Sequence, residues 1–280
     1  MEKKIVYMAE LDADVDDIIA VEYLHQKGVL QEVVCDPQPK TDIGRKRKLA
    51  LEEKGIKVSK KMPPNAKDIF VGGALTEVAR YALTHKIDTL VMMNGGFVGC
   101  NIVEDPLEKF KGKETIRTFN FNCDVKATDS VLRNPNIGQI ILVGKNVCHH
   151  MGNTGDFLWM DEQKLLDQYH VKSGKRLHDL LACREGLVYL GLLEEPHYLK
   201  YETVYPYHNG LQGNQTRWGS KRLPTGYRSV LAAVDWDCSL LPNPVLKMIL
   251  NSAYGTGIYD KGSKCVGRNS LGSYLTSKAQ

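Results

Sequence analysis

The sequence predicts an α/β fold with an open, mostly parallel sheet that is covered by helices on both faces. Short apolar runs typical of buried strands recur along the chain, at residues 4–9, 32–34, 68–71, 89–93, 139–143 and 230–234. Segments with helical spacing of apolar residues lie between them, at residues 17–26, 43–54, 76–84, 125–133, 161–169 and 178–186. Because strands and helices alternate, we expect parallel strands connected by helical crossovers.

The composition indicates one globular domain. The chain has 280 residues, of which 42% are hydrophobic and 25% are charged, which is enough to bury a sizeable core. No linker rich in Pro, Gly or Ser interrupts the first 250 residues, so we expect a single domain over residues 1–250 and a tail or oligomer contact over residues 251–280. The apolar stretch near the N-terminus is about six residues long, too short for a signal peptide or a membrane span, and we expect a cytoplasmic protein.

The cysteines and the basic segments favour no binding function. The seven cysteines form no C-x-x-C pair, a pattern that fits neither a zinc site nor a secreted disulfide framework. Residues 40–61 hold nine Lys and Arg against three Asp and Glu, but no aromatic residues lie among them. We therefore expect a solvated helix face there, and no nucleic-acid or membrane partner.

Five acidic side chains lie within eight residues, from Glu10 to Asp17, directly after the first apolar run. Carboxylates this close raise one another's pKa unless a cation or several donors lie among them. Oxygen ligands favour a hard ion such as calcium or magnesium. Asp16 and Asp17 would also suit the first turn of a helix, where the helix dipole favours negative charge, but this does not explain Glu10, Asp12 and Asp14. In open parallel sheets, ligands bind beyond the carboxyl ends of the strands, where this cluster is expected.

Two kinds of acidic loop explain the cluster poorly. An EF-hand loop is excluded because Asp17 and Tyr23 stand where that loop needs Gly and Glu. A strand followed by D-x-D also resembles the nucleophile loop of haloacid-dehalogenase-type phosphatases. That motif expects Thr or Val where this chain has Asp16, so a phosphatase is a weaker alternative.

Starting at Glu10, the cluster reads E-x-D-x-x-x-D-D, which resembles the D-x-D-x-x-x-D-D signature of the nucleoside hydrolases, the inosine-uridine-preferring nucleoside N-ribohydrolases. Further segments similar to that family follow in the same order, at residues 73–77 (GALTE), 93–101 (MNGGFVGCN), 119–127 (FNFNCDVKA), 177–182 (LHDLLA) and 215–217 (QTR). The resemblance spans roughly residues 5–250. It implies a Rossmann-like nucleoside hydrolase fold in a shortened, divergent member, and a homo-oligomer, dimer or tetramer.

The resemblance implies calcium-dependent hydrolysis of the N-glycosidic bond of purine and pyrimidine ribonucleosides, which releases free base and ribose. Calcium would be bound by Asp12, Asp17, Asp179 and the carbonyl of Thr76. Asp12 would also take the proton of the attacking water. His178 would protonate the departing base or donate a hydrogen bond to it, because an imidazole can do so near neutral pH.

The resemblance also assigns residues that bind the sugar. Asp16 and Asn120 would bind the ribose hydroxyls, and Asn101 would contact the 5′ end. Glu10 replaces the first aspartate of the family signature, whose role is mostly supporting.

The segment between Asn101 and Asn120 departs most from the family. It is about eleven residues longer than in the family and contains several basic residues, including Arg117. Thr118 stands where the family has a glutamate that reaches the 5′-hydroxyl. Losing an anion and gaining cations would suit a 5′-phosphate, so cleavage of nucleoside 5′-monophosphates is an alternative. A protein that binds nucleosides or nucleotides without turnover is another.

Overall fold

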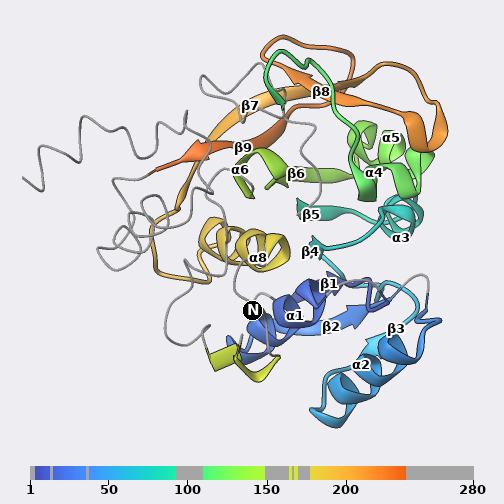
Figure 1. The fold of residues 1–280 in the computed structure, drawn as a ribbon, viewed down its shortest axis with the longest axis vertical. Coiled ribbons are helices and arrows are strands. Elements are labelled where there is room, and N and C mark those ends of the chain that lie inside the picture. Colours follow the sequence, from blue (N-terminus) through green and yellow to red (C-terminus); the bar gives the residue numbers. More distant parts are fainter. Residues whose placement is uncertain are drawn as a thin grey trace, which may run out of the picture.

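The protein is a mostly parallel sheet with helices on both faces, as seen in a computed structural model (Figure 1). The structure describes residues 4–12, 15–35, 38–92, 110–148, 164–165, 167–169 and 177–237. Within these ranges, nine strands form one sheet in the order β3-β2-β1-β4-β5-β6-β9-β7-β8. The pairs from β3 to β9 are parallel, whereas β7 is antiparallel to both β9 and β8.

The strands are β1 (Ile5–Met8), β2 (Leu30–Val34), β3 (Val58–Ser59), β4 (Asp68–Val71), β5 (Ile87–Met92), β6 (Ile137–Leu142), β7 (Leu199–His208), β8 (Trp218–Lys221) and β9 (Val230–Trp236). The helices are α1 (Asp16–Gln26), α2 (Asp42–Glu53), α3 (Thr76–Tyr81), α4 (Phe119–Cys123), α5 (Val125–Arg133), α6 (Lys145–Cys148), α8 (His178–Tyr189) and the 3-10 helix η3 (Gly213–Gln215).

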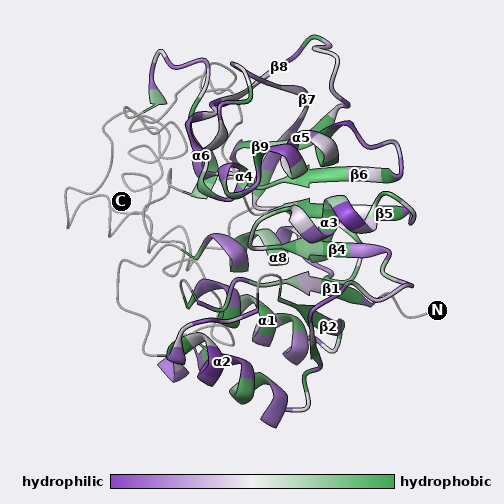
Figure 2. Cartoon of the chain, turned by 90° about the vertical axis from the view of Figure 1, so that its right-hand side faces the viewer, coloured by the Kyte–Doolittle hydropathy of each residue, from purple (hydrophilic) through white to green (hydrophobic). Residues whose placement is uncertain are grey.

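Alternating side chains of the strands build a hydrophobic core on each face of the sheet. In β1, Ile5 and Tyr7 pack with α1 and α8 on one face, and Val6 and Met8 pack with α3 and α5 on the other. All four side chains of this strand are buried, as expected for a central parallel strand with both faces covered. Figure 2 shows hydrophobic residues along the central strands, whereas α2 at the edge is largely hydrophilic.

The structure confirms the predicted fold class and the alternation of strands and helices. The predicted strand at 68–71 and the predicted helix at 125–133 have the observed bounds. The other predicted elements that the structure describes between residues 4 and 143, and those at 178–186 and 230–234, differ from the observed ones by a few residues at their ends. Within the predicted helix at 161–169, the described residues 164–165 and 167–168 are helical, whereas residues 161–163 and 166, and all of residues 251–280, lie outside the described residues. In the described part of the chain, no helix is both long and apolar enough to span a membrane.

The antiparallel hairpin of β7 and β8 was not predicted. β7 carries polar residues such as Lys200 and Glu202 between its apolar ones, and most of its side chains are partly buried or exposed. It also contains Pro206, which disfavours a strand prediction. The short helices α4 and α6 were also missed, because four or five residues are too few to show a helical period.

Candidate functional site

Three buried carboxylates lie at the N-termini of two adjacent helices. Asp16 and Asp17 begin α1, directly after β1, and Asp179 lies in the first turn of α8, which packs against α1. Their exposed fractions are 6%, 4% and 2%. The helix dipoles favour negative charge at these positions. The fold therefore brings together at one edge of the sheet carboxylates that are far apart in the sequence.

Asp17 is held by the end of β1 and by the turn after β4. Its Oδ1 accepts hydrogen bonds from the Glu10 backbone N–H (3.1 Å) and from the Tyr7 hydroxyl (3.3 Å). Gly72 covers the same carboxylate so closely that a Cβ there would lie 2.3 Å from Asp17 Oδ1 and 2.4 Å from the Tyr7 hydroxyl. Only glycine fits at this position without displacing Asp17.

Asp16 connects the two helix N-termini. Its Oδ2 accepts a hydrogen bond of 3.0 Å from the backbone N–H of His178, the first residue of α8. This bond satisfies one of the N–H groups that a helix start leaves without an intrahelical partner. It also fixes His178 next to the acidic residues, although 162 positions separate the pair in the sequence.

The buried carboxylates strongly perturb one another and their neighbours. Burial raises the pKa of Asp17 well above its ordinary value, and the charges of Asp16 and Glu10 raise it further, although the hydrogen bond from Glu10 N–H lowers it. Burial and the charges of Asp17, Asp179 and Asp16 likewise raise the pKa of Tyr7. A bound cation would relieve this accumulation of negative charge.

Asp12 is bound to the start of α2 rather than to the buried carboxylates. Its carboxylate accepts hydrogen bonds from Lys40 N–H (2.8 Å), Thr41 N–H (3.0 Å) and Thr41 Oγ1 (2.8 Å). The backbone hydrogen bond from Lys40 is the main reason that the pKa of Asp12 is lowered. Glu10 is half-buried, and burial followed by the charge of Asp12 raises its pKa. Asp12 must turn before it can join the other acids.

Thr76 and Asn120 border the same edge from the side of β4. Thr76 begins α3, and its hydroxyl donates a hydrogen bond of 2.9 Å to Asp124 Oδ2. Asn120, on α4, donates from Nδ2 to the carbonyl of Gly72 at 2.8 Å. Gly72 also covers Asp17, so Gly72 is the residue that connects Asn120 to the buried acids. The role of the Thr76 carbonyl as a ligand stays a prediction.

A pocket of about 490 Å³ lies beside α4. It is lined by Arg117, Thr118, Phe119, Asn122, Cys123, Lys145 and Asn214. Burial and, to a smaller extent, the charge of Glu10 raise the pKa of Cys123. The pocket is connected to the acidic residues through α4, because Asn120 of this helix contacts Gly72, which covers Asp17. The sequence predicted Arg117 and Thr118 here. Lys145 was missed, although its place just after a predicted strand was a usable signal.

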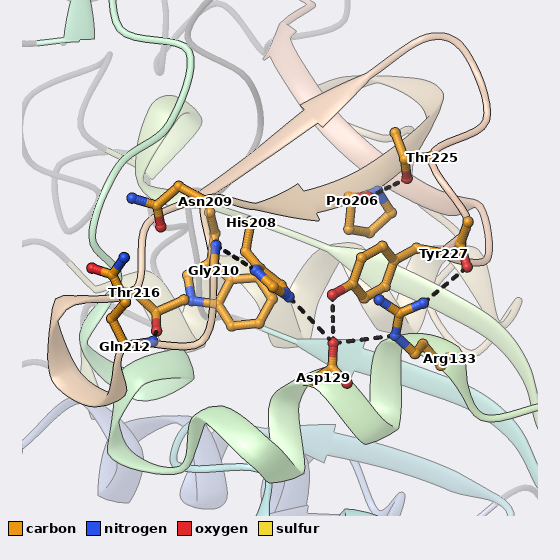
Figure 3. Close-up of polar contacts among 12 residues, drawn as sticks. Asp129, Arg133, Pro206, His208, Asn209, Gly210, Gln212, Thr216, Thr225 and Tyr227 are labelled. Carbon is orange, nitrogen blue, oxygen red and sulfur yellow. Dashed lines mark hydrogen bonds and ion pairs between the residues drawn. The ribbon is translucent and has the colours of Figure 1, made fainter.

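Polar contacts around Asp129 connect α5 with the end of β7 and with the loop before β9 (Figure 3). Asp129, on α5, accepts from Tyr227 and from Arg133 Nε (3.2 Å), and it pairs with His208 Nε2 at 3.5 Å. His208 Nδ1 in turn accepts from Gly210 N–H at 2.8 Å, at the start of the loop that leads to η3. Asn122 Nδ2 completes the connection by donating to the carbonyl of Asn214 in η3 at 2.9 Å.

The chemistry of the site residues fits a calcium ion, but their present arrangement is not a finished metal centre. In the described ranges, no three His, Cys, Asp or Glu side chains are grouped to hold a metal as they stand. The donors are nevertheless buried carboxylate oxygens, which calcium prefers. Asp17 and Asp179 could hold the ion, and Asp12 could join after turning from α2. Asn101, the predicted contact for the 5′ end, lies outside the described residues.

Comparisons with known proteins support the fold. No family model matches the sequence. An uncharacterised protein of Aquifex aeolicus (strain VF5) is 27% identical over 166 residues, and this match spans about half the length of each chain, 54% in both. The solved structure of a plant nucleoside hydrolase superposes with a TM-score of 0.56 and 15% identity, covering 89% of this chain and 99% of that one. The chain therefore has a nucleoside hydrolase-like fold.

Proposed function

We propose that this protein is an N-glycosyl hydrolase that cleaves ribonucleosides into free base and ribose with the help of calcium. The observation that carries this proposal is the group of buried carboxylates, Asp16, Asp17 and Asp179, at the ligand-binding edge of the sheet. Cleavage of an N-glycosidic bond passes through an oxocarbenium-like state that carries positive charge on the sugar. Negative groups held in a partly dry site stabilise such charge far better than they would in water.

The sugar would be held between the two sides of this edge. Asp16 would accept hydrogen bonds from the ribose hydroxyls, and Asn120 would exchange its bond to the Gly72 carbonyl for one to the sugar. A site built to hydrogen-bond a hydroxyl rejects a substrate that lacks it, because its buried polar groups then stay without partners. We therefore expect ribonucleosides to be preferred over deoxyribonucleosides.

Calcium, when bound by Asp17 and Asp179, would orient the ribose hydroxyls and offset the negative charge of the site. Asp12 would serve as the general base for the attacking water, because a carboxylate is ionised at neutral pH and can accept a proton. For this role the Asp12 side chain must exchange its hydrogen bonds with Lys40 and Thr41 for contact with the substrate side.

His178 would assist departure of the base. Its backbone N–H is bound to Asp16, so its position relative to the sugar-binding carboxylate is fixed. A histidine at this position can donate a proton or a hydrogen bond to the leaving base near neutral pH.

Release of base, sugar and phosphate from a panel of nucleosides and nucleotides, with and without a calcium chelator, tests this proposal. We expect base and reducing sugar to appear together, and chelation to abolish both. Asp17→Asn and Asp179→Asn should lose turnover, whereas Asp42→Asn should not, because Asp42 is an exposed residue at the start of α2.

Two other outcomes would point to other functions. Ligand binding without release of base would indicate a nucleoside- or nucleotide-binding protein. Release of phosphate that depends on magnesium would indicate a phosphatase. Either result would overturn the proposal.

A further inference from the structure

The pocket beside α4 is lined by two cationic side chains, the partly buried Lys145 and the exposed Arg117. Within the described residues, Arg117 and Lys145 form no ion pair, and no Asp or Glu lines the pocket. Lys145 is also partly buried, and burial lowers its pKa. Removing an ammonium group from water without a counter-ion costs free energy, so such a group indicates a missing anion.

A buried hydroxyl in the same pocket could complete an anion site with these two cations. Thr118 also lines the pocket, and it is 1% exposed. In the described structure its buried hydroxyl oxygen has no hydrogen-bond partner. A buried hydroxyl is rarely left without a partner, and one that lines a pocket can donate to a ligand oxygen.

Lys145 lies on the side of the sheet where ligands of such folds bind. It is the first residue of α6, which follows β6. In open parallel sheets, ligands bind beyond the carboxyl ends of the strands. The ammonium group of Lys145 is therefore placed where a bound anion could reach it.

The pocket lies close enough to the buried acids for one ligand to reach both. Residues 118, 119, 122 and 123 of the pocket belong to α4 or its N-cap, and Asn120 of the same helix contacts Gly72 above Asp17. A helix of five residues is about 7.5 Å long. One nucleotide could therefore place its ribose against the acids and its 5′ substituent in the pocket.

We infer that Arg117, Thr118 and Lys145 form a subsite for a phosphate monoester, the 5′-phosphate of a nucleoside 5′-monophosphate. The inference rests on the proposed N-glycosyl hydrolase function and specifies its substrate class. Arg117 would bind the phosphate oxygens through its planar guanidinium, and Lys145 would act as a point charge. Hydrolysis would add water across the N-glycosidic bond and release the free base and ribose 5-phosphate.

Base release should be compared among a nucleoside, its 5′-monophosphate and its 3′-monophosphate, with inorganic phosphate as a competitor. We expect the 5′-monophosphate to have the highest kcat/KM, and inorganic phosphate to inhibit its cleavage competitively. Lys145→Met and Arg117→Gln should each lower the ratio of kcat/KM for the 5′-monophosphate to that for the nucleoside by about 10- to 100-fold. Lys126→Met should leave this ratio unchanged, because Lys126 is exposed on α5 and does not line the pocket.

Each result separates the subsite from the proposed function. Cleavage of the nucleoside alone, or equal preference for the 3′- and 5′-monophosphates, would overturn the subsite and leave the hydrolase function intact. If no base is released from any compound, the hydrolase function fails, and calorimetry then tests the subsite by itself. The subsite is supported if the protein binds the 5′-monophosphate more tightly than the nucleoside and if Lys145→Met loses this difference. Equal binding of the two compounds would overturn the subsite.

Discussion

Replacement of Gly72 by alanine tests the geometry of the site most directly. A Cβ at this position would lie 2.3 Å from Asp17 Oδ1 and 2.4 Å from the Tyr7 hydroxyl, whereas real Cβ contacts are almost never below 3.0 Å. The Asp17 carboxylate must therefore shift by about 0.7 Å, from 2.3 to 3.0 Å. The Asp17 carboxylate cannot move freely, because its Oδ1 also accepts a hydrogen bond from Glu10 N–H.

The expected losses follow from this displacement. Overpacking of a buried site costs about 1–3 kcal/mol, which corresponds to a fall in Tm of roughly 2–12 °C for a chain of this size. A displacement approaching 1 Å at a catalytic site can cost about 100-fold in rate. Gly72→Ala should therefore lower the rate of base release severely, while the folded protein is only moderately destabilised.

Thermal unfolding and base release should be measured for Gly72→Ala and for Gly73→Ala. The neighbouring Gly73 is a matched control, because the nearest atom to its Cβ would be Glu10 Cβ at 3.6 Å, an ordinary contact. Gly73→Ala should keep both activity and Tm. If the two variants have the same activity, Gly72 does not position a functional Asp17, and our account of the site is wrong.

Three further predictions concern stability. Glu185→Ala should lower the free energy of unfolding by about 3–5 kcal/mol in urea denaturation, because Glu185 is fully buried and pairs with Arg184. Glu185→Gln should cause a smaller loss of stability, and equal losses in the two variants would argue against the ion pair. Without calcium, Tm should fall as pH rises above the ordinary carboxyl range, because the raised pKa of Asp17 means that the folded state holds the Asp17 proton more tightly than the unfolded state does. Asp17→Asn should weaken this pH dependence, and an unchanged Tm profile in that variant would contradict the prediction. Calcium at about 100 times its Kd should add about 2.7 kcal/mol of stability, measured by calorimetry, and Asp179→Asn should abolish this gain.

The sequence predicted the fold class because the patterns that indicate strands and helices are local. Short apolar runs and helical spacing are visible within ten residues, and they identified all the long parallel strands and α1, α2, α3, α5 and α8. The hairpin of β7 and β8 was missed because its stability comes from pairing with β9 and from contacts around Asp129, neither of which is local. The sequence of a partly buried strand with alternating polar residues does not reveal these pairings and contacts.

The candidate site was predicted in part. The acidic run after the first strand and the histidine and aspartate at 178–179 were both identified, and the structure places Asp16, Asp17 and Asp179 at one edge. The sequence could not show that Asp12 points toward Thr41, because that orientation depends on hydrogen bonds to a segment 29 positions away. It also could not show that Gly72 must be glycine to leave room for Asp17.

The sequence by itself determined the alternation of the parallel strands with the longer helices, and hence the edge at which the acids lie, because a strand followed by a helix in a parallel sheet places the connecting loop at the carboxyl end. Only the tertiary structure decided which side chains meet there. Asp16 binds the N–H of His178, and Lys145 shares a pocket with Arg117, because the strand order brings the segments after β1, β5 and β6 to one edge. These contacts join residues from distant parts of the chain, so no local pattern could specify them.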